Sequence, residues 1–207
     1  MRVPELMRRW SDMAIPLMAQ VPEAEREPVQ SRALAAKSLL SPGASEADLA
    51  EMKSRLHRRV PDDLRDILSA SDGFVIPSLG SGPALFLSSR EIGLFRDCAP
   101  DCYDAWYAKA VLSDPISEGE ILFGEEREEF EAPAKETLRK ALVLSTERGG
   151  EILLACPEAF DPERKVEDWT YCKLSTSEPI VRFGSLYMVL SHLIDRSLEG
   201  LGEFEWP

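Results

Sequence analysis

The side chains that most often act in catalysis or metal binding are sparse here and do not fall into catalytic patterns. The two histidines, His57 and His192, lie far apart, and neither has a Cys, Asp or Glu pair at metal-ligand spacing. His57 stands beside Arg58 and Arg59 at the predicted exposed end of a helix. No G-x-S-x-G, P-loop, dinucleotide-binding or H-E-x-x-H pattern occurs. We therefore expect no enzymatic activity, no metal and no cofactor, and we interpret both histidines as structural or solvent-exposed.

The four cysteines, Cys98, Cys102, Cys156 and Cys172, are too few for a disulfide framework in a chain of 207 residues. Cys98 and Cys102 are four positions apart around Pro100, but a metal site would need further ligands, such as a second cysteine pair. Cys156 and Cys172 fall in separate predicted strands that would be neighbours across a sheet. We interpret the cysteines as reduced thiols and, above all, as small hydrophobic side chains.

The strongest chemical pattern outside the expected core is Glu118–Glu136, within a predicted acidic insertion over residues 113–136. It holds eight glutamates against Arg127 and Lys135, which leaves a local charge of −6. Folding does not call for so many like charges, because they repel one another. The stretch is either a solvated insertion or a docking surface for a basic partner, with its apolar residues as anchors. The candidate partner-binding residues are Glu118, Glu120, Phe123, Glu125, Glu126, Glu128, Glu129, Phe130 and Glu131.

The whole chain is acidic, with 37 Asp and Glu against 24 Lys and Arg and a formal net charge of −13. Phosphate contacts need clustered Lys and Arg, so this balance argues against nucleic acid and against an anionic membrane surface. It favours a partner with a basic surface. The sequence contains no run of about 18 apolar residues, so we expect no membrane-spanning helix. The apolar run Met13–Val21 lacks the features of a signal peptide, so we expect a cytoplasmic protein.

The elements that must position these residues start with a pair of helices in Ser45–Phe74. Ser45 and Asp48 form an S-x-x-D capping pattern, and apolar residues repeat at helical spacing behind it. Pro61 opens a second helix, because proline is tolerated at a helix start. Asp72-Gly73 ends that helix, since glycine adopts the left-handed conformation that a helix stop needs.

The rest of the chain predicts strands and a closing helix. The expected elements are a loop over 74–83, a strand over 84–87, a helix over 103–111, a hairpin over 142–156 with Gly149 and Gly150 near its turn, a charged connection over 157–167, a strand over 169–174, a strand or helix lead-in over 179–183 and a helix over 185–196. Trp169 and Tyr171 share one side of their strand. We expect them in the core, with a binding surface on the sheet as the alternative.

Two short helices are predicted in an N-terminal extension over residues 1–43. Leu6, Trp10 and Met13 share one helical face, which Pro16 interrupts. A second apolar stripe over 29–40 predicts the other helix. We expect the extension to pack on a domain formed by residues 44–207.

The order of these pieces resembles the SUKH superfamily, the Smi/Knr-like cell-wall regulators and bacterial immunity proteins. The likeness spans roughly residues 44–196: the helix pair with Val60-Pro61 and Asp72-Gly73, LFL at 85–87, SREI at 89–92 in the place of a short helix, ERGGEILLA at 147–155 and FGSLYMVL at 183–190. The family usually has Leu-Pro and Asn-Gly where this chain has Val-Pro and Asp-Gly.

The resemblance implies an α+β fold, with an antiparallel sheet of about four to six strands packed against N-terminal and C-terminal helices. In bacteria it often implies a non-enzymatic immunity protein. We therefore expect an inhibitor that binds and neutralises a cognate secreted toxin by occluding a basic active-site cleft. The alternative is a regulatory or scaffold protein of the same fold that recruits a partner. Deletion of residues 1–43 would then abolish recruitment, whereas toxin neutralisation would survive it.

Overall fold

The computed structural model describes residues 3–79, 82–112, 127–129, 133–161, 166–176 and 180–202 of the chain. In chain order its elements are α1 (Val3–Met18), η1 (Glu23–Glu25), α2 (Pro28–Ala36), α3 (Glu46–Leu56), α4 (Asp62–Ala70), β1 (Phe74–Leu79), β2 (Gly82–Phe86), α5 (Phe95–Cys98), α6 (Pro100–Leu112), β3 (Arg127–Glu129), α7 (Lys135–Lys140), β4 (Leu142–Val143), β5 (Glu151–Asp161), β6 (Val166–Ser175), β7 (Ile180–Phe183) and α8 (Leu186–Gly202).

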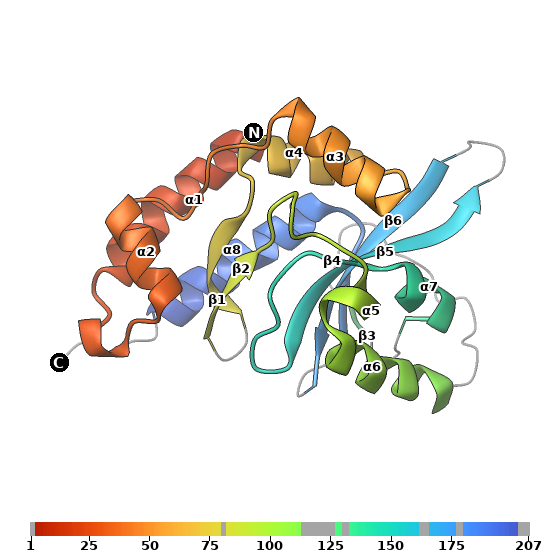
Figure 1. Ribbon diagram of the computed structural model, residues 1–207. Helices are drawn as coiled ribbons and strands as arrows, with labels where there is room; N and C mark the ends of the chain where they lie inside the picture. The colour runs from red at the N-terminus through yellow and green to blue at the C-terminus, as the bar shows by residue number, and fades with distance from the viewer. Residues whose placement is uncertain are drawn as a thin grey trace.

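The strands form two antiparallel sheets, and helices from both ends of the chain pack on them (Figure 1). The main sheet has five strands in the order β3-β7-β6-β5-β4, and β1 pairs with β2 in a separate sheet. The C-terminal helix α8 packs against β1, β7 and the N-terminal helix α1, while α7 packs against β5. The predicted α+β fold, with a sheet of four to six strands, is confirmed.

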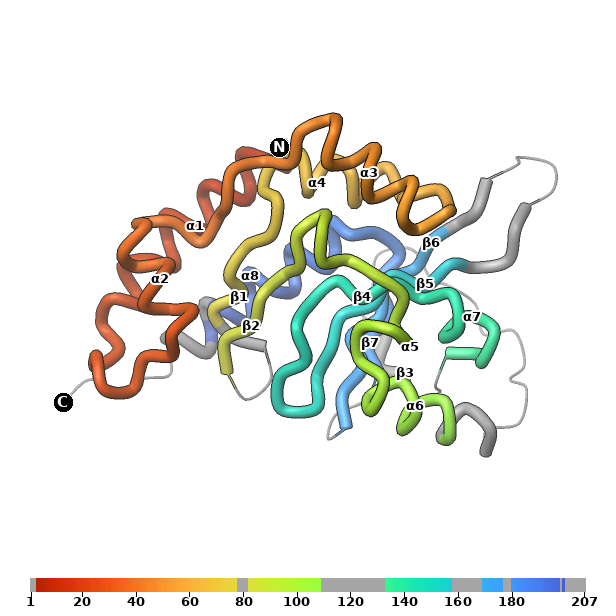
Figure 2. The backbone as a smooth tube through the Cα atoms, viewed as in Figure 1, coloured from red at the N-terminus to blue at the C-terminus, as the bar shows by residue number. Residues whose placement is uncertain are grey.

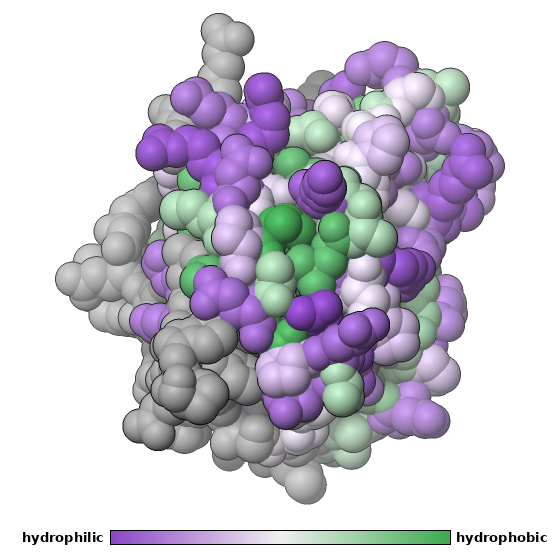
Figure 3. Space-filling view, turned by 90° about the vertical axis from the view of Figure 1, so that its left-hand side faces the viewer, coloured by the Kyte–Doolittle hydropathy of each residue, from purple (hydrophilic) through white to green (hydrophobic). Residues whose placement is uncertain are grey.

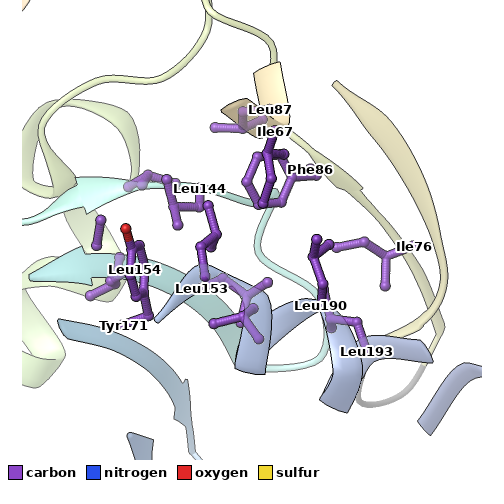
Figure 4. Close-up of a cluster of buried hydrophobic side chains, with 14 of the residues drawn as sticks. Ile67, Ile76, Phe86, Leu87, Leu144, Leu153, Leu154, Tyr171, Leu190 and Leu193 are labelled. Atoms are coloured by element: carbon purple, nitrogen blue, oxygen red, sulfur yellow. The ribbon is translucent and has the colours of Figure 1, made fainter. Parts of the chain in front are cut away.

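The two central strands of the main sheet are buried on both faces. Consecutive residues from Ile152 to Cys156 of β5 are all at most 1% exposed, and Tyr171 and Cys172 of β6 are also buried. Because successive side chains of a strand point to opposite faces, both faces must be covered. Figure 4 shows Leu144 and Leu153 of the β4–β5 hairpin beside Leu190 and Leu193 of α8, with Phe86 and Ile76 of the small sheet close by.

Helix α1 belongs to this core. Met7, Trp10, Ala14 and Met18 are all 0% exposed, and the Trp10 ring meets the edge of the Phe74 ring at a centroid distance of 5.6 Å. The predicted stripe was wrong at Met13, which is 48% exposed, because the buried face follows the spacing of residues 7, 10, 14 and 18. The helix also runs two residues beyond Pro16 to its end at Met18.

The start of α2 is tied to the main sheet. Glu27 and Gln30 form a reciprocal capping box at the start of α2. The Glu27 carboxylate also pairs with Arg148, which lies in the turn between β4 and β5. The N-terminal helices thus contact both the core and the central hairpin.

The helix pair forms as its capping residues predict. The Ser45 hydroxyl accepts a hydrogen bond from the Asp48 amide at 3.2 Å, and the Asp48 carboxylate accepts one from the Ser45 amide at 3.0 Å. Helix α4 follows Pro61, and Gly73 has the predicted left-handed backbone with φ of 85°. Helix α3 ends at His57, which is also left-handed with φ of 50°.

Two predicted segments differ from the structure. Within the loop expected over 74–83, residues 74–79 are β1 and residues 82–83 begin β2, while 80 and 81 lie outside the described residues. Phe74 stacks on Phe86 across the two strands at a centroid distance of 4.5 Å. The segment Ser89–Ile92 is a hydrogen-bonded turn rather than a short helix, since the Glu91 and Ile92 amides both donate to Ser88 O. Apolar packing of Phe74 and Ile76 outweighs the Gly, Pro and Ser content that predicted a loop.

The hairpin and closing helix are confirmed, with β5 and α8 longer than predicted and the first strand, β4, limited to Leu142 and Val143. Gly149 and Gly150 form the left-handed turn before β5, with φ of 58° and 82°. Strand β5 continues to Asp161 and β6 begins at Val166, so the connection predicted over 157–167 is shorter. Antiparallel pairing extends into residues that the sequence pattern alone places outside the strands.

Candidate partner-binding surface

The acidic insertion begins and ends at neighbouring helices, α6 and α7, which lie together in Figure 2. Arg139 of α7 donates a hydrogen bond from Nη2 to the Tyr107 hydroxyl of α6 at 2.6 Å, and its Cζ lies 5.4 Å from the ring centroid. The Lys135 ammonium lies 5.5 Å from the same ring. We call Tyr107, Lys135 and Arg139 the aromatic–cation clamp. It joins α6, which precedes the insertion, to α7, which starts with the insertion's last two residues.

The clamp rests on the core through a series of aromatic rings. Tyr107 stacks on Tyr103 at a centroid distance of 5.3 Å, and Tyr103 meets Phe95 edge-on at 5.5 Å. Phe95 is fully buried. Such aromatic pairs add about 0.5–1.5 kcal/mol beyond the area that they bury. The position of the insertion's two ends is therefore fixed by packing that reaches the core.

Electrostatics reinforce the clamp on the α7 side. Arg139 forms an ion pair with Glu136, one turn earlier in the same helix. The Tyr107 side chain, followed by Glu136, raises the pKa of Arg139, so this guanidinium keeps its charge. The cation that faces Tyr107 is thus permanent.

The insertion also contributes a strand to the main sheet. Arg127–Glu129 form β3, in which Glu128 pairs with Val181 and Glu129 with Ile180 of β7. Charged residues are common on edge strands, where they discourage pairing with other chains. Strand β3 therefore places the backbone of Glu128 and Glu129 at the outer edge of the sheet. The other predicted partner-binding residues lie outside the described residues: Glu118, Glu120, Phe123, Glu125, Glu126, Phe130 and Glu131.

Asp63 is a connecting residue that the sequence analysis did not single out. Its carboxylate accepts hydrogen bonds from the Tyr171 hydroxyl at 2.5 Å and from the Leu186 amide at 2.9 Å. Helix α4, strand β6 and the start of α8 therefore meet at one carboxylate. Burial, followed by the charge of Asp63, raises the pKa of Tyr171, so its hydroxyl stays protonated and continues to donate.

The two aromatic residues of β6 have different environments. Tyr171 is 1% exposed, as its predicted core position requires. Trp169 is only half-buried, and the Arg58 guanidinium lies over its ring at 5.1 Å from the centroid. The prediction of core packing is thus confirmed for Tyr171 and holds only in part for Trp169.

The Asp-Gly stop after α4 has a second role in positioning the next turn. The Asp72 carboxylate accepts hydrogen bonds from the Ser89 amide at 2.5 Å and from its hydroxyl at 3.1 Å. Arg55 of α3 donates to the carbonyls of Ser89 and Ile92, each at 2.8 Å. The helix pair therefore holds the turn that leads into α5.

A buried ion pair also escaped the sequence analysis. Lys173 and Glu151 lie 3.6 Å apart on β6 and β5, with side chains 4% and 3% exposed. They are two register positions apart on one face of the sheet, since Lys173 pairs directly with Leu153. Charged residues at inward positions of two predicted strands were the available signal. Burial of both charges leaves no route by which a partner contacts them.

The remaining reactive side chains do not converge. His57 is exposed at the end of α3, as predicted, and the His192 ring lies 5.2 Å from that of Phe183. Cys156 and Cys172 are buried on adjacent strands, whereas Cys98 is exposed. Partial burial, followed by the charge of Asp97, raises the pKa of the Cys98 thiol, which disfavours the reactive thiolate. Within the described ranges, no three His, Cys, Asp or Glu side chains gather in a way that would hold a metal ion.

Comparisons of the chain with protein-family models, with curated proteins and with solved structures give no match. Among the helices that the structure describes, none is long and apolar enough to span a membrane.

Proposed function

We propose that this protein is a SUKH-like immunity protein, a non-enzymatic inhibitor that binds a cognate toxin and occludes its basic active-site cleft with the acidic insertion. The observation that carries the proposal is the aromatic–cation clamp. Tyr107, which precedes the insertion, contacts Lys135 at its end and Arg139 just beyond it. Because this contact joins α6 to α7, the acidic segment between them begins and ends at one place on the protein, which would present its charges together to a partner.

Charge supports a basic partner. The stretch Glu118–Glu136 carries −6 of the chain's net −13. Charges at the rim of an interface mainly raise the association rate, and they do so most strongly at low salt. Apolar side chains within the insertion, including Phe123 and Phe130, would supply the buried contacts that slow dissociation.

The test is a charge-reversal comparison at constant net charge. One variant carries Glu125→Lys, Glu126→Lys, Glu128→Lys and Glu129→Lys. The matched control carries four reversals at exposed glutamates outside the insertion: Glu5, Glu23, Glu25 and Glu199. Association with the toxin domain encoded beside this chain is measured by surface plasmon resonance at low and at physiological salt.

We expect the insertion variant to associate about tenfold more slowly at low salt and to lose most of its salt dependence. The control variant should change the association rate much less, because its charges are remote from the interface. Equal rates for the two variants would refute the role of the insertion. Failure of the wild-type chain to bind or inhibit the neighbouring toxin domain would refute the immunity function itself.

A scaffold role is the second candidate, and a surface feature favours it. Figure 3 shows hydrophobic side chains gathered at the centre of one face, ringed by hydrophilic ones, on the side of the molecule where α2 lies. Patches of this kind often mark protein interfaces. Deletion of residues 1–43 does not separate the two functions, because Met7 and Trp10 are part of the core. The charge-reversal control variant is used in place of that deletion. Three of its four reversals, at Glu5, Glu23 and Glu25, fall in the N-terminal extension.

A further inference from the structure

The end of α3 is strongly basic within an acidic protein. Five of the seven residues from Lys53 to Arg59 are Lys, Arg or His, while the chain as a whole carries −13. Three of these side chains have structural partners, and two of the three, Arg55 and Arg59, do not line the surface described next. Arg55 donates to the carbonyls of Ser89 and Ile92, and Arg59 pairs with Asp62 at 2.9 Å.

Lys53, His57 and Arg58 line a shallow, open depression of about 530 Å³. The described residues along it are Ala50, Lys53, Ser54, His57 and Arg58. They follow positions one turn apart along α3, so they form a continuous stripe on its outer face. Every polar side chain in this stripe can donate a hydrogen bond, and none is a carboxylate. Within the described part of the chain, Lys53 and His57 are not in ion pairs with acidic residues.

Arg58 is held in place from behind. Its guanidinium stacks over the Trp169 ring at 5.1 Å from the centroid, and its Nη1 donates a hydrogen bond to the carbonyl of Lys140. A cation over an aromatic face is stabilised by about 0.5–1 kcal/mol at exposed sites. Because these contacts fix the plane of the guanidinium, a ligand would pay little to order it.

We propose that this depression binds the phosphate group of a small organic anion. A phosphate group offers three acceptor oxygens on one centre. The Arg58 guanidinium, the Lys53 ammonium and the His57 imidazole could each donate a hydrogen bond to one of them. The volume lies within the range of small-molecule sites, about 300–1,000 Å³, and exceeds the space that a phosphate ion alone would fill. The proposal does not depend on the immunity function, since it concerns a different surface.

The test is a binding titration of the full chain with inorganic phosphate, pyrophosphate and adenosine monophosphate. Backbone-amide NMR locates the binding site, and calorimetry measures the affinity. The test variant is Lys53→Gln with His57→Asn, because asparagine tolerates the left-handed backbone that His57 adopts. The matched control is Arg59→Gln, a neighbouring cation that does not line the depression. Unchanged thermal unfolding of each variant confirms that the fold is kept.

We expect wild-type shifts at the amides of α3 and at least a tenfold loss of affinity in the test variant, with less than about a twofold change in the control. Tighter binding of the nucleotide than of inorganic phosphate would support an organic phosphate ligand, and equal binding of the two would overturn the organic part of the proposal. The proposal is overturned if no probe binds below about 10 mM. It is also overturned by equal losses in both variants, or by a single-stranded oligonucleotide binding the same residues more tightly than every small probe.

Discussion

Single carboxylates connect distant parts of this protein, and Asp63 connects the most. We expect Tyr171→Phe to lower the free energy of unfolding by about 1.5–3 kcal/mol, the range for hydrogen bonds to charged groups. Asp63→Ala should cost at least as much, because it leaves the buried Tyr171 hydroxyl and the Leu186 amide without their acceptor. Urea unfolding of the two single variants and the double variant measures both losses and the coupling between them.

The neighbouring Asp62 supplies the control. Its side chain is 69% exposed and forms only surface ion pairs with Arg59 and Arg65. Asp62→Ala should therefore cost less than about 1 kcal/mol. A loss in Asp62→Ala equal to that in Asp63→Ala would show that the general effect of charge near the start of α4 dominates over the hydrogen bonds.

The capping box of α3 has a defined pH signature. The Ser45 hydroxyl, then the Ser45 amide and Arg90, hold the pKa of Asp48 at about 2, below its ordinary 3.8. A carboxylate with a lowered pKa stabilises the fold above its unfolded-state pKa, and this contribution is lost as pH falls. We expect the stability advantage of wild type over Ser45→Ala to shrink between about pH 4 and pH 2. Urea unfolding across that range measures it, and a constant difference would contradict the cause given.

Residue-scale features differ in how far the sequence predicts them. Ser45 and Asp48 are three positions apart, so their capping is readable from a few letters. The partners of Asp63, by contrast, lie 108 and 123 positions away in the chain. Asp72 was predicted as part of a helix stop, yet its carboxylate also binds Ser89. Contacts of that kind depend on the folded chain path, which local spacing does not encode.

At the scale of elements, α1 is part of the same hydrophobic core as the sheets, so we expect the N-terminal extension to unfold together with the rest of the chain. Trp10 is fully buried against Phe74, whereas Met13 on the same helix is 48% exposed. We expect Trp10→Ala to lower the free energy of unfolding by about 3–5 kcal/mol, the range for removal of a large core side chain. Met13→Ala should stay within about 0.5 kcal/mol. Chemical denaturation compares the two, and a small effect of Trp10→Ala would mean that α1 is dispensable.

The ends of α3 and α4 were predicted more closely than those of the strands, for a physical reason. Caps, proline and glycine mark the ends of α3 and α4 within the helix sequence itself. Strands gain stability from partners elsewhere, so β1 formed despite Pro77 and the nearby glycines, and β3 formed within a run of glutamates. Strand β5 likewise continues past its apolar core into Asp161, because β6 pairs with it there.

At the scale of the whole molecule, the main sheet encloses a pair of opposite charges. The core strands are covered on both faces, and the one ion pair described as lying between them, Lys173 with Glu151, has both charges buried. Removing one partner of a buried ion pair lowers stability more than replacing both partners with apolar residues does. We therefore expect this pair to constrain the register of β5 against β6 more than it adds to the free energy of unfolding. We expect the net charge of −13 to favour partners with a basic surface.

The candidate site was predicted in part. Charge density alone marks Glu118–Glu136 as unusual, and no structural knowledge is needed to notice it. The clamp at its base was not predicted, because Tyr107 and Arg139 are 32 positions apart and each is ordinary in its own helix. The basic depression was missed for a related reason: the net charge of the chain directs attention away from a local cationic stripe.

The clamp has an evolutionary consequence. Because α6 and α7 hold the two ends together, the stretch between them resembles an exchangeable cassette. The entropy cost of closing a chain segment between joined ends rises by only about 0.6 kcal/mol for each doubling of its length. We therefore expect insertions and deletions to be tolerated there, except at β3, which pairs with β7 of the main sheet. Diversification among relatives should accordingly concentrate between Leu112 and Lys135, and the residues of the clamp should change far more slowly than the segment that they enclose.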